Sequence, residues 1–481
     1  MNVKLIIRVL GFLLFVEGVA MLFALLVALI YQENDITAFL ISSGIAIATG
    51  GIILTTTKKA AKDIGKREGF IIVSSVWVLF SFFGSLPYII SGAIPNFTNA
   101  FFETISGFTT TGSSILNNIE ELPHGILFWR SFTQWLGGMG IIVLSLAILP
   151  VFGIGGMQLY VAEVPGPTPD KISPRIRQTA KTLWIIYLGF TLMETLLLWI
   201  GGMTFFDSVC HSLTTMATGG FSTKQASVAY WDSPFIQYVI VFFMFVAGTN
   251  FTLSYLALKG KFRSVLKDEE FRYYGFFVLG FTLLIFLGLY VTTTLGVERS
   301  FRDSLFQVVS IMTTTGFATA DYLTWQPILT ILIFALFFFG GSAGSTGGSI
   351  KIMRIVLLIK NSYYELRRML HPNAIIPVKF NKHSVDPKII TNVLAFFMLY
   401  FIIFAFSTII FTLIDPDMES AMGAVATSLG NIGPGLGNVG PAETFAHISP
   451  FGKWFLSFLM LLGRLELFTV LVLFSPSFWK E

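Results

Sequence analysis

The sequence predicts an all-α polytopic membrane protein with about ten transmembrane helices and four further, shorter re-entrant helices. Of its 481 residues, 54% are hydrophobic and 12% are charged, whereas soluble domains carry about 25% charged residues. Long apolar segments recur along the chain, and runs rich in glycine and threonine interrupt them at matching places. The single cysteine, Cys210, excludes an intramolecular disulfide and a thiolate metal cluster. We expect it to pack as a small apolar residue.

Ten apolar segments approach or exceed the roughly 20 residues needed to cross a bilayer. They are residues 5–31, 36–57, 69–92, 126–152, 182–202, 235–258, 274–296, 326–359, 389–414 and 452–475. The first is longer than the roughly 7–15-residue core of a signal peptide, and no clear cleavage site follows it. We therefore interpret it as a retained helix, in which Glu17 faces protein rather than lipid.

Four connections rich in lysine and arginine predict the orientation of the chain. They are KKAAKDIGKRE from Lys58, DKISPRIRQTAK from Asp170, KGKFRSVLKDEEFR from Lys259, and the long segment 351–388. The positive-inside rule places all four in the cytoplasm, and an even number of spans then places both termini there. Such runs chiefly orient a membrane protein, and a docking surface for a cytoplasmic partner is an additional interpretation.

The four outer connections align on one glycine without a gap. They read NAFFETISGFTTTG to Gly112, DSVCHSLTTMATGG to Gly220, DSLFQVVSIMTTTG to Gly316 and SAMGAVATSLGNIG to Gly433. The apolar residues Phe108, Met216, Met312 and Leu429 stand four positions before the glycines. We expect four short helices, N-capped by Asn99, Asp207, Asp303 and Ser420, each leading into an extended polar strand. With a span on either side, the chain forms a pseudo-four-fold helix–pore–helix arrangement.

The aligned runs are suited to binding a monovalent cation. Re-entrant backbone is tolerated only where it is buried in protein or lines water. Glycine permits conformations that turn successive carbonyls the same way, and carbonyl oxygens with threonine hydroxyls can replace the hydration shell of an ion. The short helices would direct the negative ends of their dipoles at that ion. No charged side chain occurs in the tetrads that end at the glycines, which favours K⁺ or Na⁺. A single run could be only a turn, but four copies in register argue against that.

The chain resembles the TrkH/TrkG/KtrB superfamily of bacterial potassium uptake proteins. The resemblance rests on the tetrads TTTG, ATGG, TTTG and GNIG, on NIGPGLG after the fourth short helix, on WLGGMGI from Trp135 and on GGSAGSTGGSIK from Gly340. It covers nearly the whole chain, and the two leading spans are more similar to TrkH than to KtrB. The fourth tetrad lacks threonine, so the hydroxyls of the lower ion sites cannot be four-fold symmetric. All four family glycines are present, which implies a preference for K⁺.

The resemblance implies a gated K⁺ pore in the cytoplasmic (inner) membrane. The implied selectivity filter, which binds K⁺ through backbone carbonyls only, comprises Thr110, Thr111, Gly112, Thr218, Gly219, Gly220, Thr314, Thr315, Gly316, Asn431, Ile432 and Gly433. The family forms homodimers regulated by a cytosolic TrkA-type ring, whose nucleotide, ATP/ADP or NAD(H), binds the partner and not this chain. No catalytic cofactor and no nucleic acid is implied. The expected units are an N-terminal two-helix segment (1–68) and pore repeats at 69–160, 161–260, 261–372 and 373–481.

A glycine-rich loop interrupts the second helix of the third repeat. GGSAGSTGGS holds five glycines in ten residues, and each costs about 1 kcal/mol relative to alanine in a helix. A phosphate-binding loop is a poor interpretation because no Gly-Lys-Ser/Thr follows and no strand precedes. We expect a flexible plug beneath the filter, matching the family's gating loop, with a simple packing kink as the alternative. Its residues are Gly341, Ser342, Ala343, Gly344, Ser345, Thr346, Gly347 and Gly348.

Arg464 lies within the last apolar segment, in LLGRLELF. An arginine inside the membrane is costly and indicates function. We expect it below the filter, opposite the glycine loop, where its charge raises the barrier for cations and its side chain can hydrogen-bond loop carbonyls. The family carries an arginine at this motif. A structural pair with a buried carboxylate is the alternative, but Glu466 is two positions away and does not share its helical face.

Other polar residues in the spans are expected to form interhelical hydrogen bonds. They are Arg130, Gln134, Glu194 and Asn250. Glu103 could add negative potential at the pore mouth or support the first short helix. Because no span carries an acidic or histidine relay, we expect passive conduction. A secondary K⁺/H⁺ or K⁺/Na⁺ symporter is the alternative, although its broken helices would occur in inverted repeats. A membrane enzyme is disfavoured because the five histidines are scattered.

Overall fold

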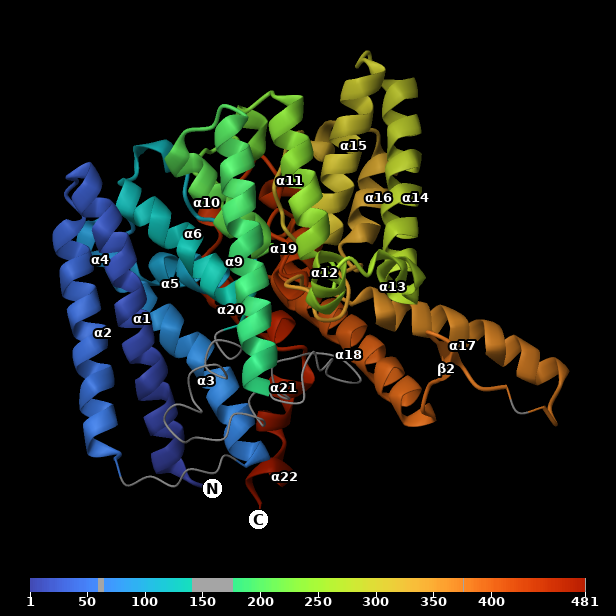
Figure 1. The fold of residues 1–481 in the computed structure, drawn as a ribbon, viewed down its shortest axis with the longest axis horizontal. Coiled ribbons are helices and arrows are strands. Elements are labelled where there is room, and N and C mark those ends of the chain that lie inside the picture. Colours follow the sequence, from blue (N-terminus) through green and yellow to red (C-terminus); the bar gives the residue numbers. More distant parts are fainter. Residues whose placement is uncertain (59–64, 141–175, 375, 481) are drawn as a thin grey trace.

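The computed structural model describes residues 1–58, 65–140, 176–374 and 376–480 (Figure 1). This part of the chain is helical except for a short antiparallel hairpin of β1 (Lys379–Phe380) and β2 (His383–Ser384). Six candidate membrane spans are long and apolar enough to cross a bilayer. They comprise α1 (Val3–Tyr31), α2 (Ile36–Thr56), α3 with α4 (Lys66–Gly84 and Leu86–Ser91), α9 (Ile176–Ile200), α14 (Glu269–Thr292) and α18 (Pro387–Thr412). Two bent helix pairs raise the count to as many as eight.

Two predicted spans, 235–258 and 452–475, are not continuous helices. α11 (Pro234–Ala247) meets α12 (Phe251–Leu258) at 110°, and α20 (Pro450–Arg464) meets the segment Phe468–Phe474, which begins with α21 (Phe468–Leu471), at the same angle. The first break follows a glycine and is stabilised by Asn250, whose side chain accepts a hydrogen bond from the Thr252 N–H at the start of α12. Composition indicated the apolar length of these segments but not the bends, which tertiary contacts fix.

The predicted spans 126–152 and 326–359, which follow the first and third short helices, also differ from a simple span. The predicted span 126–152 begins in α6 (His124–Gly138), and its residues 141–152 lie outside the described residues. The predicted span 326–359 is divided, as expected, between α16 (Pro327–Leu336) and α17 (Ile352–Leu370). Much of the basic stretches from Lys58 and Asp170 also lies outside the described residues.

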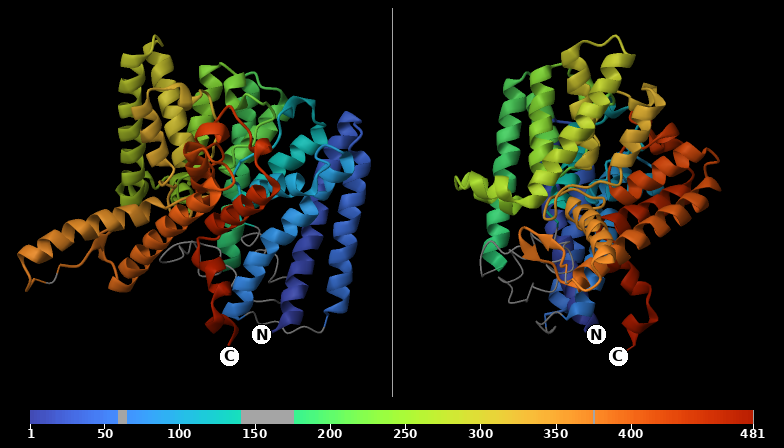
Figure 2. Two further views of the ribbon diagram at one scale, coloured as in Figure 1. Left: turned by 180° about the vertical axis from the view of Figure 1, so that it is seen from behind. Right: turned by 90° about the vertical axis from the view of Figure 1, so that its right-hand side faces the viewer.

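Four helices of 12–16 residues precede the glycines on which the sequence was aligned: α5 (Phe97–Phe108), α10 (Phe205–Met216), α15 (Val297–Met312) and α19 (Met418–Gly430). We call them the pore helices. Two small helices, α13 (Phe262–Lys267) and α22 (Pro476–Trp479), complete the described set. The chain termini lie at the same end of the molecule, and α17 projects from its side (Figures 1 and 2).

The leading hairpin of α1 and α2 is packed through glycines. A Cβ on Gly11 would lie 2.2 Å from the Ile53 side chain, and one on Gly50 would lie 2.7 Å from the Gly11 carbonyl oxygen. Small residues let membrane helices approach this closely, where dispersion contacts hold them together. Glu17 is 1% exposed, which confirms that it faces protein.

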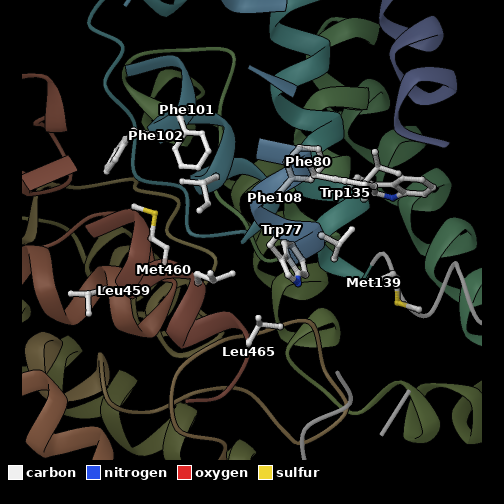
Figure 3. Close-up of a cluster of buried hydrophobic side chains, with 14 of the residues drawn as sticks. Trp77, Phe80, Phe101, Phe102, Phe108, Trp135, Met139, Leu459, Met460 and Leu465 are labelled. Carbon is white, nitrogen blue, oxygen red and sulfur yellow. The ribbon is translucent and has the colours of Figure 1, made fainter. Parts of the chain in front are cut away.

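The pore helix α5 packs through large apolar side chains against helices from both ends of the chain. The cluster in Figure 3 joins Trp77 and Phe80 of α3, Phe101, Phe102 and Phe108 of α5, Trp135 of α6, and Leu459 and Met460 of α20, together with Met139 and Leu465. Phe80 and Trp129 both meet the Phe108 ring edge-on. First and last parts of the chain therefore share one core. Cys210 is fully buried within α10, as expected.

Candidate functional site

The pore helices begin earlier than the sequence predicted. Side chains of Asn96, Thr204 and Asp417 cap α5, α10 and α19, and each accepts a hydrogen bond from the N–H three residues later. That third residue is the predicted cap, Asn99, Asp207 or Ser420. These three predicted N-caps are therefore wrong by one turn. Both members of each pair are polar, so composition does not distinguish them.

α15 departs further from the prediction. It begins after Gly296 with no side-chain cap, which places Asp303 inside the helix rather than at its start. There Asp303 lies 3.8 Å from the Arg299 guanidinium, one turn earlier.

At the cap of α19, the hydroxyl and N–H of Ser420 donate to Asp417 and lower the pKa of this carboxyl.

The four strands after the pore helices share one backbone conformation. We call them the filter strands, residues 110–112, 218–220, 314–316 and 431–433. Their first residues, Thr110, Thr218, Thr314 and Asn431, have φ of 55°, 53°, 59° and 53°. Their last residues, Gly112, Gly220, Gly316 and Gly433, have φ of 84°, 76°, 83° and 108°. The alignment made on sequence alone is therefore also an alignment of backbone geometry.

Left-handed backbone is unusual for threonine. A β-branched residue at positive φ is a genuine outlier, whereas asparagine tolerates it. Such strain costs about 1–3 kcal/mol at each residue and persists where the surroundings over-determine it. Asn431 therefore fits the position with less strain than the three threonines. Its side-chain amide donates to the Thr111 hydroxyl and to the Met460 carbonyl, both at 2.9 Å.

N–H groups of the filter strands point back into the pore helices. The residue before each glycine donates to the carbonyl five positions earlier: Thr111 to Ser106, Gly219 to Thr214, Thr315 to Ser310 and Ile432 to Thr427, at 2.8–3.0 Å. These carbonyls belong to the helix C-termini, which otherwise lack partners. These bonds fix each strand on its own pore helix, and the carbonyl before each glycine is directed away from that helix.

The four strands close into a ring. A Cβ built on Gly112 would lie 2.2 Å from the carbonyl oxygen of Gly219, and one on Gly220 would lie 2.1 Å from that of Thr315. In the same way, a Cβ on Gly316 would lie 2.0 Å from the carbonyl oxygen of Ile432, and one on Gly433 would lie 3.0 Å from that of Thr111. The carbonyl before each filter glycine thus abuts the preceding strand, and that of strand one abuts strand four. The four filter strands therefore follow one another in chain order around a single axis, with the fourth strand beside the first.

Most carbonyls in this ring have no hydrogen-bond partner among the described residues. Those of Thr111, Thr315 and Ile432 accept no hydrogen bond from any described residue. The Gly219 carbonyl accepts one from Gln134, whose amide oxygen in turn accepts the Phe221 N–H at 3.0 Å. Above the ring lies a cavity of ≈ 80 Å³, lined by all four filter glycines and by Arg130 and Lys224.

The glycine loop, residues 340–349, packs directly against the ring. The Gly348 N–H donates to the Thr314 hydroxyl at 2.6 Å, and the Thr346 hydroxyl lies 3.2 Å from the Met216 carbonyl at the end of α10. A Cβ on Gly347 or Gly348 would meet the carbonyl of Thr313 or Gly430. The loop therefore contacts the ends of three pore helices, and only glycine fits this closely.

Arg464 connects the loop to the first repeat. Its guanidinium donates to the Thr346 carbonyl at 2.9 Å and to the carbonyls of Gly137 and Gly138 at the end of α6. It was expected opposite the glycine loop, and the structure places it in direct contact. Glu466 instead forms an ion pair with Arg354 of α17, which agrees with the expectation that Arg464 and Glu466 do not share a face.

Two further charged residues hold the loop and were not singled out in the sequence. Glu270 of α14 accepts hydrogen bonds from the N–H groups of Ala343 and Met353, at 2.7 and 3.2 Å. Lys351, 4% exposed, donates to the Gly347 carbonyl. Glu270 lies some 70 residues from the loop in sequence, so only tertiary structure brings them together. Lys351 closely follows the loop motif, and this position was an available signal.

The remaining predicted polar residues lie around the ring or in the helical core. Glu103 and Arg130 form a buried ion pair, with 2.7 Å between Oε1 and Nε. Asn250 lies beside Gly344 of the loop. Glu194 of α9 is fully buried next to Thr215 of α10.

The fold and the site define a multi-pass membrane protein of the transport class. A family model described as TrkH, cation transport protein, matches residues 35–481, and the chain belongs to this family. It is 43% identical to the Trk system potassium uptake protein TrkH of Escherichia coli (strain K12) and 34% identical to TrkG of the same strain, over 99–100% of each chain. The crystal structure of the potassium transporter TrkH from Vibrio parahaemolyticus matches with a TM-score of 0.89 and 40% identity, covering 100% of both chains. The predicted family and the prediction of a non-enzymatic transport protein are confirmed.

Proposed function

We propose that this chain takes up potassium through one ion-conducting pore along the axis of the four filter strands. The observation that carries the proposal is the closed ring, in which the carbonyl before each filter glycine abuts the neighbouring strand. Carbonyl rings of this kind replace the hydration shell of K⁺. The printed names of the relatives, potassium uptake proteins, support K⁺ as the cargo.

The filter consists of the twelve residues of the four filter strands, with K⁺ bound by backbone carbonyls. The pore helices end at these strands, so their negative dipole ends face the ion. Three strained threonines support a functional site, because strain of this kind concentrates where geometry must be fixed. The finer architecture belongs to the proposal: ten spans, four pore repeats with the boundaries predicted above, and both termini in the cytoplasm.

The gate comprises the glycine loop from Gly341 to Gly348 together with Arg464. The loop lies against three pore-helix ends, and the Arg464 guanidinium bonds to the Thr346 carbonyl. A loop in this place blocks the path below the ring, and a fixed positive charge beside it raises the energy of a cation. Release of the loop from Arg464 and Glu270 opens the pore.

Regulation comes from outside this chain. A homodimer in the inner membrane, docked to a cytosolic TrkA-type subunit that carries the nucleotide, is the assembly we propose. The relatives' names place them in a Trk system, and α17 projects from the side of the bundle (Figure 1). Such an element is well placed to transmit a movement to the loop that directly precedes it.

Ion flux in proteoliposomes tests the proposal. The purified chain should admit K⁺ under a K⁺ gradient alone, with a reversal potential set by K⁺ and with Na⁺ excluded. Flux that requires a pH or Na⁺ gradient would instead show the coupled symporter. A pore without ion preference would remove the filter assignment.

A further inference from the structure

Each pore helix presents one side chain to the strand that leaves the filter. The position lies nine residues before the filter glycine and is occupied by Glu103, His211, Gln307 and Ala424. The first three side chains are polar but only 0–1% exposed. Burying such groups is unfavourable unless they are hydrogen-bonded, so their partners indicate what they do.

The three polar residues bond to the outgoing strands two to four residues after the glycine. Glu103 accepts from the Ser114 hydroxyl and the Ile115 N–H, both at 2.9 Å. The His211 ring Nε2 lies 3.0 Å from the Ser222 hydroxyl. Gln307 donates to the Ala320 carbonyl at 3.1 Å. We call these three contacts the filter tethers.

The fourth repeat holds its outgoing strand by direct packing. Ala424 has no polar group, but the neighbouring Gly423 brings the backbone close. A Cβ on Gly423 would lie 2.3 Å from the Leu436 N atom, three residues after the filter glycine. All four strands are thus held at the same level, three by side chains and one by backbone contact.

Arg130 connects two of the tethers. Its Nε donates to Glu103 at 2.7 Å, its Nη1 donates to the Ser222 carbonyl at 2.8 Å, and its guanidinium lies 3.7 Å from the centre of the Phe221 ring. The side chain is 2% exposed. Through it, the strands leaving filters one and two form one hydrogen-bonded unit.

We propose that Glu103, Arg130, His211 and Gln307 are positioning residues that fix the spacing of the filter strands and thereby set the preference for K⁺ over Na⁺. The inference rests on the proposed function, in which these strands select the ion. Selection by carbonyls depends on cavity size and on how firmly the carbonyls are held. Strands anchored at both ends, by the pore helix below and the tether above, resist the contraction that the smaller Na⁺ requires. Arg130 serves two strands and has the largest effect.

Arg130→Lys is the first test. Lysine keeps the charge but lacks the planar fork that serves two acceptors at once. Reversal potentials in proteoliposomes should show the K⁺/Na⁺ permeability ratio falling about tenfold, equal to about 1.4 kcal/mol, while K⁺ flux persists. Arg302→Lys is the matched control. Arg302 is also a buried arginine, on α15, but it pairs with Glu298 and Gln237 and not with a filter strand.

Gln307→Ala is the second test and leaves no buried charge behind. It removes one hydrogen bond, worth about 1 kcal/mol, so the permeability ratio should fall about fivefold. Gln237→Ala is its control, because Gln237 is also buried but bonds to the Trp231 carbonyl and to Arg302 rather than to a filter strand. This variant decides the question if Arg130→Lys fails to fold.

The outcomes separate this inference from the proposed function. Unchanged permeability ratios in folded Arg130→Lys or Gln307→Ala protein, with a lowered ratio in Gly316→Ser, would overturn the tethers and leave the filter in place. An unchanged ratio in Gly316→Ser as well would overturn both. Lowered ratios in both tether variants, with both controls at the wild-type value, support the inference.

Discussion

The Gly348 N–H donates a hydrogen bond to the hydroxyl of Thr314, 2.6 Å away. Thr314 is the left-handed residue that opens the third filter strand, with φ of 59°. The glycine loop is therefore bonded to the filter itself and not only to the wall beneath it. Movement of the loop would remove a partner from a strained residue, so opening of the proposed gate and the geometry of the third strand are coupled.

Gly316→Ser should weaken ion selectivity. A Cβ at this position would lie 2.0 Å from the Ile432 carbonyl oxygen, and φ of 83° is unfavourable for any side chain. The carbonyl must move away from the ring, and we expect the K⁺/Na⁺ permeability ratio to fall about tenfold, the equivalent of ~1.4 kcal/mol. Gly51→Ser on α2, where a Cβ would meet nothing within 4 Å, is the control. Wild-type ratios in the folded Gly316→Ser variant would contradict the filter assignment.

Deleting Ser342–Ser349 should raise basal K⁺ flux in proteoliposomes. The deletion removes the N–H that bonds to Thr314 and the hydroxyl that bonds at the end of α10. Gly348→Ala is a smaller change with the same expected direction, because its Cβ would lie 2.4 Å from the Gly430 carbonyl and displace the loop. Flux below wild type in both folded variants would show that the loop is a structural kink.

Arg464→Ala should also raise basal flux. The substitution removes a positive charge beside the proposed pathway and frees the Thr346 carbonyl from its bond. Arg464→Lys should give an intermediate flux, since it keeps the charge but not the bonds to both the loop and α6. Arg272→Ala, an exposed arginine on α14, serves as the control. A flux unchanged by Arg464→Ala would mean that the guanidinium only supports the fold.

Glu270→Ala should loosen the loop from the other side. Its carboxylate accepts hydrogen bonds from the N–H of Ala343 within the glycine loop and from the N–H of Met353 at the start of α17. Hydrogen bonds to a charged acceptor are worth about 1.5–3 kcal/mol, so we expect a rise in basal flux of tenfold or more, with a smaller rise for Glu270→Gln. Glu269→Ala is the neighbouring control, since Glu269 contacts Lys360 and Asn381 rather than the loop. Equal flux in both alanine variants would exclude Glu270 as a latch.

The register of the filter strands was predictable because it depends only on residues that are close together in the sequence. Each strand follows its pore helix directly, and the requirement for positive φ selects glycine at the same place four times. Asn431 seemed to break the pattern, but its backbone conformation matches that of Thr110, Thr218 and Thr314. The residue type of Asn431 therefore differs from the other three positions, but its backbone φ does not.

Contacts between distant parts of the chain could not be predicted in the same way. Glu270, on α14, looked like one more acid beside a basic connection, and its role depends on how α14 packs against the loop. The bends after Ala247 and Arg464 also depend on packing: a Cβ on Gly463 would lie 2.1 Å from the Leu429 carbonyl. Helix starts were missed because paired polar residues such as Thr204 and Asp207 look alike in sequence.

The direction of the N–H groups in the filter strands has a consequence for anions. Because the N–H group before each filter glycine is engaged by a pore-helix carbonyl, carbonyl oxygens rather than these donors face an ion on the proposed pore axis, which disfavours chloride. The negative ends of four helix dipoles repel it as well. Discrimination by sign of charge is thus a property of the main chain. Chloride should remain excluded in variants that lose the distinction between K⁺ and Na⁺.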